Sequence, residues 1–203
     1  MRRKLLLTAM LVVTTAAMML TACNKKKTQP ADSVAATEAS EEEDADAQYA
    51  TTLLQAGAEA PDFTLNTPEG KPVTLSALRG QYVVIDFWAS WCPDCRKDIP
   101  AVKALYDTYA SKGVTFLGVS FDTEAEKWTK CIAENEMNWT HVSPLQKWKT
   151  KNADGTQQVH ITVAKDYGVE WIPSMYLIDP EGRVVVRTVM VEKIGQALAT
   201  AFQ

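Results

Sequence analysis

The feature that most constrains the fold is a pair of cysteines placed directly after an apolar segment. Residues 82–88 (Tyr-Val-Val-Ile-Asp-Phe-Trp) are apolar except for one acid, as expected for a strand buried on both faces of a sheet. Cys92 and Cys95 follow, so a helix that starts at Pro93 carries one sulfur at its N-terminus and the other one turn further along. Free backbone N–H groups and the positive end of the helix dipole stabilise a thiolate at Cys92. The pattern therefore predicts a reversible dithiol–disulfide pair.

The first 22 residues have the composition of an export signal. Residues 1–4 are basic, and the apolar stretch from Leu5 to Leu20 carries no charge and is short for a membrane-spanning helix. The sequence Leu-Thr-Ala-Cys at 20–23 resembles the lipobox of bacterial lipoproteins. This resemblance implies cleavage before Cys23, lipidation of its thiol and a firm membrane anchor. The alternative is an ordinary signal peptide followed by an incidental cysteine.

Two further regions are expected after the signal: a lipidated cysteine with a flexible acidic linker at 23–55, and one folded domain at 56–203. The linker has few large apolar residues and contains the acidic run 41–44, so it cannot bury a core of its own. The remaining chain has the size of one domain with a substantial core. The formal net charge is −4 and no basic patch is present, so nothing indicates a nucleic-acid partner, and we expect a monomer.

Hydrophobic periodicity in the domain predicts one sheet covered by helices. The expected elements are a small hairpin within 61–75, strands at 82–88, 114–120 and 138–142, helices at 93–111, 124–135, 161–167 and 193–202, and a hairpin of strands 174–178 and 184–188. Residues 144–160 are polar and give no clear pattern. The order predicts an α/β fold with a single sheet and helices on both faces.

The other cysteine and the two histidines do not form a recognisable metal site. In an oxidising compartment a CxxC pair is structural or catalytic, whereas in the cytosol it can be half of a zinc site. If Cys23 is lipidated and Cys92 pairs with Cys95, then Cys131 is left over, either as an inert buried thiol or as a third redox centre. Zinc would need two more ligands, and none has a finger-like spacing. We therefore expect no metal and no cofactor.

The motifs together resemble a known family. Residues 86–95 (Asp-Phe-Trp-Ala-Ser-Trp-Cys-Pro-Asp-Cys), with Pro100 beyond them, resemble the active-site segment of thioredoxins. Residues 171–174 (Trp-Ile-Pro-Ser) resemble the cis-proline loop of that fold. The opening at 60–65 and the long segment 121–160 resemble the envelope-anchored TlpA/ResA-like thiol-disulfide oxidoreductases. The resemblance implies a thioredoxin fold, with a mixed central sheet and an N-terminal hairpin extension, and protein-disulfide oxidoreductase activity.

The resemblance and the residue chemistry suggest catalytic roles. Cys92 is expected to be the exposed nucleophile that forms a mixed disulfide with the substrate, and Cys95 the buried thiol that resolves it. Asp86 is the one acid in an apolar strand, so burial should raise its pKa and let it accept the proton of Cys95. Asp98 is a second candidate, because ResA-like proteins carry a buried Glu at the matching position. The alternatives are a structural ion pair for Asp86 and an exposed helix position for Asp98.

Four positions are expected to contact the substrate: Trp91, Pro93, Ile172 and Pro173. A cis bond before Pro173 would leave the backbone of Ile172 free to pair with an extended substrate. Trp171 is a further candidate for substrate contact. The alternative to a cis bond is an ordinary trans proline in a loop at position 173.

The function that these observations favour is disulfide exchange with thiol or disulfide-bearing proteins, as a reductase anchored in the cell envelope and facing the periplasm. By resemblance, a membrane-embedded thiol protein donates the electrons and apocytochrome c is one client. A peroxiredoxin shares the Ala-Pro-Asp-Phe opening, but its Pro-x-x-x-Thr-x-x-Cys pattern would need proline and threonine at Ile85 and Ala89. A copper-binding chaperone would use both cysteines and a histidine, for which His160 is a poor match.

Overall fold

The computed structural model describes residues 44–203 of the chain. The predicted export signal, the lipidated Cys23 and the linker as far as residue 43 lie outside the described residues. Within 44–203, no helix is long and apolar enough to cross a membrane.

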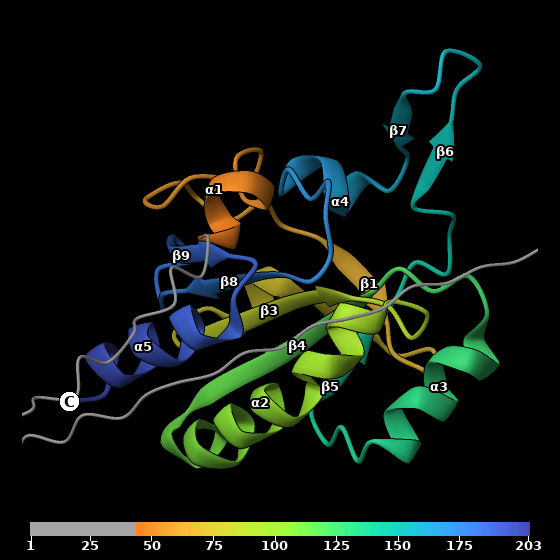
Figure 1. Cartoon of the computed structure of the whole chain (residues 1–203). Helices are drawn as coiled ribbons and strands as arrows, with labels where there is room; N and C mark the ends of the chain where they lie inside the picture. Colours follow the sequence, from red (N-terminus) through yellow and green to blue (C-terminus); the bar gives the residue numbers. More distant parts are fainter. Residues whose placement is uncertain (1–43) are drawn as a thin grey trace, which may run out of the picture. The chain divides into compact units, whose positions relative to one another are not determined.

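A five-stranded mixed sheet forms the centre of the domain (Figure 1), with the strand order β5-β4-β3-β8-β9. The strands are β3 (Tyr82–Trp88), β4 (Val114–Ser120), β5 (Thr140–Val142), β8 (Ser174–Ile178) and β9 (Val184–Thr188). β3, β4 and β5 are parallel, β8 runs antiparallel to them, and the edge strand β9 is antiparallel to β8. The predicted α/β fold is confirmed, and β3 lies in the middle of the sheet, with six of its seven residues buried.

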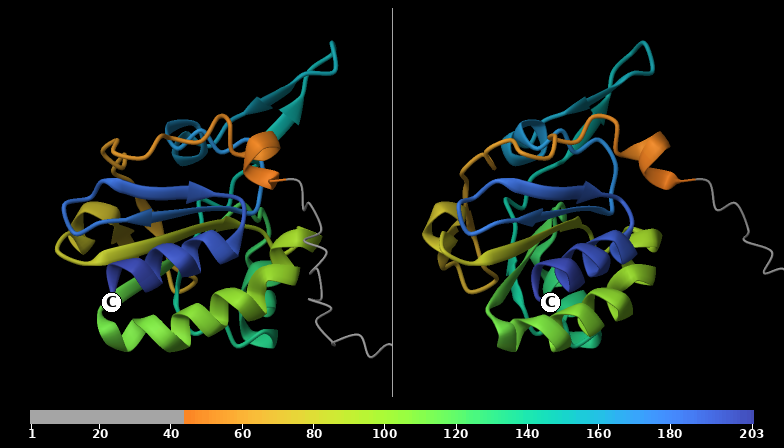
Figure 2. Two further views of the ribbon diagram at one scale, coloured as in Figure 1. Left: turned by 60° about the vertical axis from the view of Figure 1, so that its left-hand side comes forward. Right: turned by 90° about the vertical axis from the view of Figure 1, so that its left-hand side faces the viewer.

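Helices cover both faces of this sheet (Figure 2). The helices are α1 (Ala45–Tyr49), α2 (Pro93–Tyr109), α3 (Ala125–Glu134), α4 (Thr162–Asp166) and α5 (Val191–Ala201), with short 3₁₀ turns at Leu75–Leu78 and Ala110–Lys112. α2 and α5 pack against each other on one side of the sheet, and α1 and α4 lie on the other. α2 contains Pro100, and the 3₁₀ turn that follows it ends at Gly113, whose φ of 91° suits a residue without a side chain.

The register of the central strands brings three chain segments to one edge of the sheet. Trp88 and Ser120 end the parallel strands β3 and β4 and lie side by side. β8 runs the opposite way and starts with Ser174 next to Phe87. The segments that follow β3 and β4 and the loop that precedes β8 therefore meet at this edge, and they include the cysteine pair and the proline loop.

Residues 44–55 pack against the domain, which differs from the flexible linker that we expected up to residue 55. Ala50 and Leu53 are fully buried. The Asp46 carboxylate accepts hydrogen bonds from Thr188 Oγ1 (2.8 Å), the Val189 N–H (2.7 Å) and Lys193 Nζ (2.7 Å). Two apolar side chains and one carboxylate are too few to produce a periodic pattern, so this attachment was not visible in the sequence.

Two small hairpins extend the sheet system. β1 (Thr64–Asn66) and β2 (Pro72–Thr74) form the N-terminal hairpin that the sequence predicted. β6 (Lys149–Lys151) and β7 (Gln157–Val159) form a second hairpin, which projects from the domain in Figure 1. The sequence did not predict this hairpin, because neither of its faces is buried and no apolar alternation marks it.

Candidate active site

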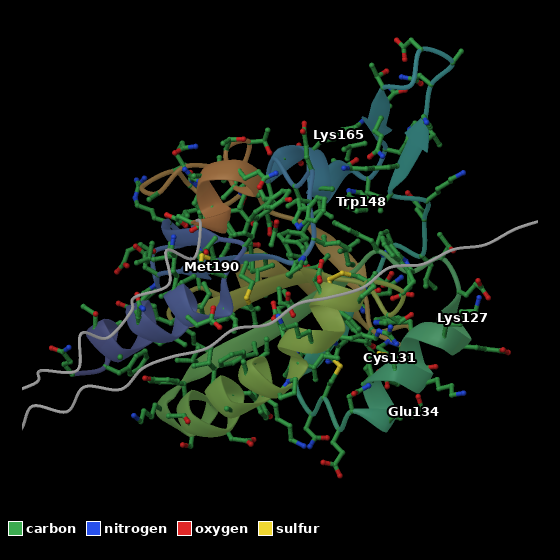
Figure 3. The ribbon with its side chains drawn as sticks, in the orientation of Figure 1. Lys127, Cys131, Glu134, Trp148, Lys165 and Met190 are labelled. Carbon is green, nitrogen blue, oxygen red and sulfur yellow. A yellow bond between two sulfur atoms is a disulfide. The ribbon has the colours of Figure 1, made fainter. Side chains whose placement is uncertain are left out.

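The cysteine pair lies at the N-terminus of α2. Cys92 is the N-cap residue, Pro93 occupies the first turn, and the Cys95 N–H donates a hydrogen bond of 3.1 Å to the Cys92 sulfur. The two cysteines form a disulfide with their Cα atoms 5.3 Å apart. Figure 3 shows this sulfur–sulfur bond at the start of the helix. A thiolate released at Cys92 would keep the backbone N–H donor and the helix dipole.

The exposure of the two sulfurs differs from our expectation. Both cysteines are only 4% exposed, so in the disulfide form Cys92 is not an exposed residue. The segments before α2 and before β8 enclose it, and its sulfur lies 3.7 Å from the carbonyl oxygen of Ile172. Cys92 nevertheless lines an open pocket, whereas Cys95 does not line it. Access from solvent is therefore to Cys92, through that pocket.

A buried carboxylate, which the sequence analysis missed, holds the loop before Cys92. Asp122 is 1% exposed, and its oxygens accept hydrogen bonds from the Ser90 N–H (2.9 Å), Ser90 Oγ (2.6 Å) and Ser120 Oγ (2.7 Å). This network ties the segment after β3 to the segment after β4. The signal for it was available, because the carboxyl ends of neighbouring parallel strands share one edge of a sheet.

The loop before β8 contains a cis peptide bond between Ile172 and Pro173. Ile172 is buried beside the disulfide, whereas Trp171 is 40% exposed. Tyr49 of α1 stacks on Trp171, with their ring centroids 4.3 Å apart. The fold thus brings residues from positions 49, 92 and 172 to one place, and Trp91 stands beside them with 54% of its surface exposed.

The two candidate acids are both perturbed. Burial raises the pKa of Asp86, and together with the smaller effect of the neighbouring Asp98 charge it brings that pKa to about 7. Burial also raises the pKa of Asp98 to about 6, together with the charge of Glu192. Asp98 is half-buried on α2, and among the described residues no salt bridge includes Asp86. Near neutral pH each group can exist in either protonation state, as a proton acceptor requires.

An open pocket of about 250 Å³ lies against Cys92. It is lined by Trp91, Cys92, Pro93, Asp94, Trp148, Lys149, Gln157, Glu170, Trp171 and Ile172. Three of the four expected substrate-contact positions line it, namely Trp91, Pro93 and Ile172. The hairpin residues Lys149 and Gln157, and Trp148 just before it, also line this pocket, and the sequence analysis did not anticipate them.

Cys131 and the two histidines do not line the pocket at Cys92. Cys131 is a free, buried thiol on α3, and burial raises its pKa. His141 is buried against the rings of Trp88 and Trp139, and His160 is hydrogen bonded to Thr150. In residues 44–203, no group of three or more His, Cys, Asp and Glu side chains could hold a metal ion.

Comparison with known proteins finds a matching family, related sequences and similar structures. The model of the AhpC/TSA family matches residues 56–187. The thiol-disulfide oxidoreductase ResA of Bacillus anthracis is 33% identical over 133 residues, which cover 65% of this chain and 68% of that protein. The thioredoxin domain of a thiol-disulfide oxidoreductase from Bacteroides vulgatus superposes with a TM-score of 0.63 at 31% identity, covering 74% of this chain and 99% of that one. A thiol-disulfide oxidoreductase from Bacteroides fragilis gives a TM-score of 0.63 at 26% identity, covering 71% and 100%.

Proposed function

The chain belongs to the AhpC/TSA family and to its ResA-like thiol-disulfide oxidoreductases, and from this premise we propose that it reduces disulfides in protein substrates at the cell envelope. The observation that carries the proposal is the redox pair itself. Cys92 caps α2, lines an open pocket and touches the Ile172 carbonyl, while Cys95 is held behind it.

The proposed reaction has two exchange steps. The Cys92 thiolate of the reduced protein attacks a client disulfide, forms a mixed disulfide and releases the first client sulfur as a thiolate, which takes up a proton. Cys95 then loses its proton and attacks the Cys92 sulfur, which releases the second client thiolate. The client gains two electrons, and the Cys92–Cys95 disulfide forms. A thiol protein in the membrane is the proposed donor that reduces it again.

In this scheme Asp86 accepts the proton that Cys95 loses. Asp86 is buried in the central strand with a pKa of about 7, so it is partly ionised at neutral pH and can accept a proton. Asp98, with a pKa of about 6, is the alternative acceptor on the same helix as Cys95. When Asp86 and Asp98 are ionised, their charges disfavour a thiolate at Cys92. Asp94, between the two cysteines, has the same effect. A less stable thiolate at Cys92 favours the disulfide form and therefore a reducing role.

The envelope location rests on the N-terminal sequence. We propose that the chain is cut before Cys23, lipidated there and anchored to a membrane, with the domain facing the periplasm. Metabolic labelling with a fatty acid tests this directly. We expect label on the natural chain, and no label and release from the membrane fraction for Cys23→Ala. Labelling that persists in Cys23→Ala contradicts the proposal.

No observation favours a peroxidase. The positions that would carry its proline and threonine are Ile85 and Ala89, which are both fully buried and apolar, so neither supplies a hydroxyl group beside Cys92.

Trapping of mixed disulfides tests the proposed exchange. A Cys95→Ser chain should accumulate covalent adducts with envelope proteins on non-reducing gels, because Cys92 can attack and nothing resolves the adduct. Cys92→Ser is the matched control and should give none. If the two variants give the same empty pattern, the proposed exchange with proteins is wrong.

A further inference from the structure

The β6–β7 hairpin provides one wall of the pocket at Cys92. Its register pairs Lys149 with Val159 and Lys151 with Gln157, so these four side chains share one face of the hairpin. Lys149 and Gln157 line the pocket, which shows that this face is the one turned towards the cysteine pair. Lys151 is therefore on the same face, two residues further along β6 towards the turn of the hairpin. The hairpin projects from the domain in Figures 1 and 2.

The floor of the pocket is aromatic. Trp148 lies at the base of the hairpin (Figure 3), stacks on Phe121 with ring centroids 4.9 Å apart, and lies 6.4 Å from the Trp91 ring. Trp171 closes the other side. Drug-sized ligands occupy pockets of roughly 300–1,000 Å³. This pocket, at about 250 Å³ and open to solvent, has the size of a single large side chain.

The hairpin also carries an unbalanced positive charge. Residues 144–160 contain three lysines and one aspartate, although the whole chain has a net charge of −4. Lys103, Lys127, Lys130 and Lys193 form salt bridges with acids, but in the described part of the chain Lys147, Lys149 and Lys151 form none. The Lys149 ammonium lies 4.4 Å from the centre of the Trp148 ring and donates to the Glu170 carbonyl. The Glu170 carboxylate also acts on Lys149 within this pocket, whereas Lys151 is exposed, so Lys151 with Lys149 beside it can take a carboxylate from a partner.

We propose that the pocket and the hairpin face form a client-binding subsite, which rests on the proposed function. The subsite takes an extended client segment with a large aromatic side chain next to its reactive cysteine and an acidic residue a few positions away. The aromatic side chain fills the space between Trp91, Trp148 and Trp171. The acidic side chain meets Lys149 and Lys151.

Stopped-flow kinetics on the reduced full-length chain in detergent tests this proposal. The probes are four synthetic peptides whose single cysteine is linked to thionitrobenzoate, with Trp or Ala beside the cysteine and Glu or Lys three residues further on. Attack by Cys92 forms the peptide adduct and releases coloured thionitrobenzoate. The mixed disulfide of glutathione and thionitrobenzoate, which lacks the aromatic side chain, reports basal exchange.

We expect the Trp/Glu peptide to react about tenfold or more faster than the Ala/Lys peptide, which corresponds to about 1.4 kcal/mol of preferential binding. The preference for Glu should shrink as salt is added, because exposed charges are screened. Lys149→Ser combined with Lys151→Ser should abolish the preference for Glu. Lys127→Ser combined with Lys130→Ser, on α3, is the matched control and should keep it.

Trp148→Ala should abolish the preference for Trp, measured as the ratio of the rates for the Trp and Ala peptides. Since Trp148 also packs on Phe121, Trp148→Phe is measured beside it and should keep part of the preference. Equal rates of the natural chain with all four peptides, or equal losses in the two lysine double variants, would overturn the subsite. A chain that fails to react even with the glutathione probe would instead overturn the proposed function.

Discussion

Replacing Asp86 by Asn should make the oxidised chain more stable at neutral and alkaline pH. The pKa of this carboxyl is 3.8 in an ordinary setting and about 7 in the folded chain, because burial disfavours its charged form. The folded state therefore holds a proton that the unfolded state has lost between pH 4 and 7. A raised carboxyl pKa lowers stability as the pH rises through this window, and the full penalty is present from about pH 7 upwards.

The size of the effect follows from the shift. Roughly three pKa units at 1.36 kcal/mol each give a ceiling of about 4 kcal/mol at pH 8. The Asn amide must itself be buried, which costs about 1–3 kcal/mol if it finds no partner. We therefore expect Asp86→Asn to raise the free energy of unfolding by about 1–3 kcal/mol at pH 8. At pH 4 we expect no gain, because the buried Asp86 carboxyl and the Asn amide that replaces it are both neutral in the folded chain.

Urea unfolding of the oxidised natural chain and of Asp86→Asn, at pH 4 and at pH 8, measures this difference. Asp98→Asn is the matched control and should gain less, because Asp98 is only half-buried. A gain of equal size at both pH values, or a loss at pH 8, would refute the assignment of a raised pKa to a buried, unpaired Asp86. The reduced variant should also resolve mixed disulfides about 10²-fold more slowly, the lower range for a lost general base.

Three further predictions concern other buried groups. Burial lowers the pKa of His141 to about 4, so the natural chain should lose up to about 3 kcal/mol of unfolding free energy as the pH falls from 6.5 to 4. His141→Leu should remove this loss, and urea titrations at the two pH values measure it. Asp122→Ala should destabilise the chain by about 2–4 kcal/mol, since it leaves the Ser90 N–H and two hydroxyls without their acceptor, and Asp122→Asn should restore part of the loss in thermal unfolding. Asp46→Ala should make residues 44–55 sensitive to limited proteolysis while Asp44→Ala changes little; equal cleavage in the natural chain would contradict the attachment of this segment.

Particular residues explain how far the sequence could predict the fold. Residues 82–88 and 114–120 are strands in the structure because almost every side chain in them is buried, and this burial is also what made them apolar in the sequence. The hairpin of β8 and β9 was predictable from the turn sequence between them. The hairpin of β6 and β7 was not predictable, because neither of its faces is buried and its residues show no apolar alternation.

The candidate site shows the same division. The Cys92–Cys95 pair and the proline loop carry local motifs, so the sequence located both. Asp122, Trp148 and Tyr49 act through contacts with residues 32, 27 and 122 positions away, respectively. Such contacts depend on the complete fold and leave no local pattern. The low exposure of Cys92 in the disulfide form has the same origin, since Ile172, whose carbonyl oxygen lies 3.7 Å from the Cys92 sulfur, comes from a distant loop.

The central claim is that Cys92 is the thiol that meets the outside partner and that Cys95 is held behind it. A short pulse of sub-stoichiometric iodoacetamide on the reduced full-length chain, followed by mass mapping of the labelled cysteines, tests it most directly. The account predicts that Cys92 is labelled first, because it lines the pocket and sits at the positive end of α2, while Cys95 and the buried Cys131 stay protected. Preferential labelling of Cys95 or Cys131 would contradict it.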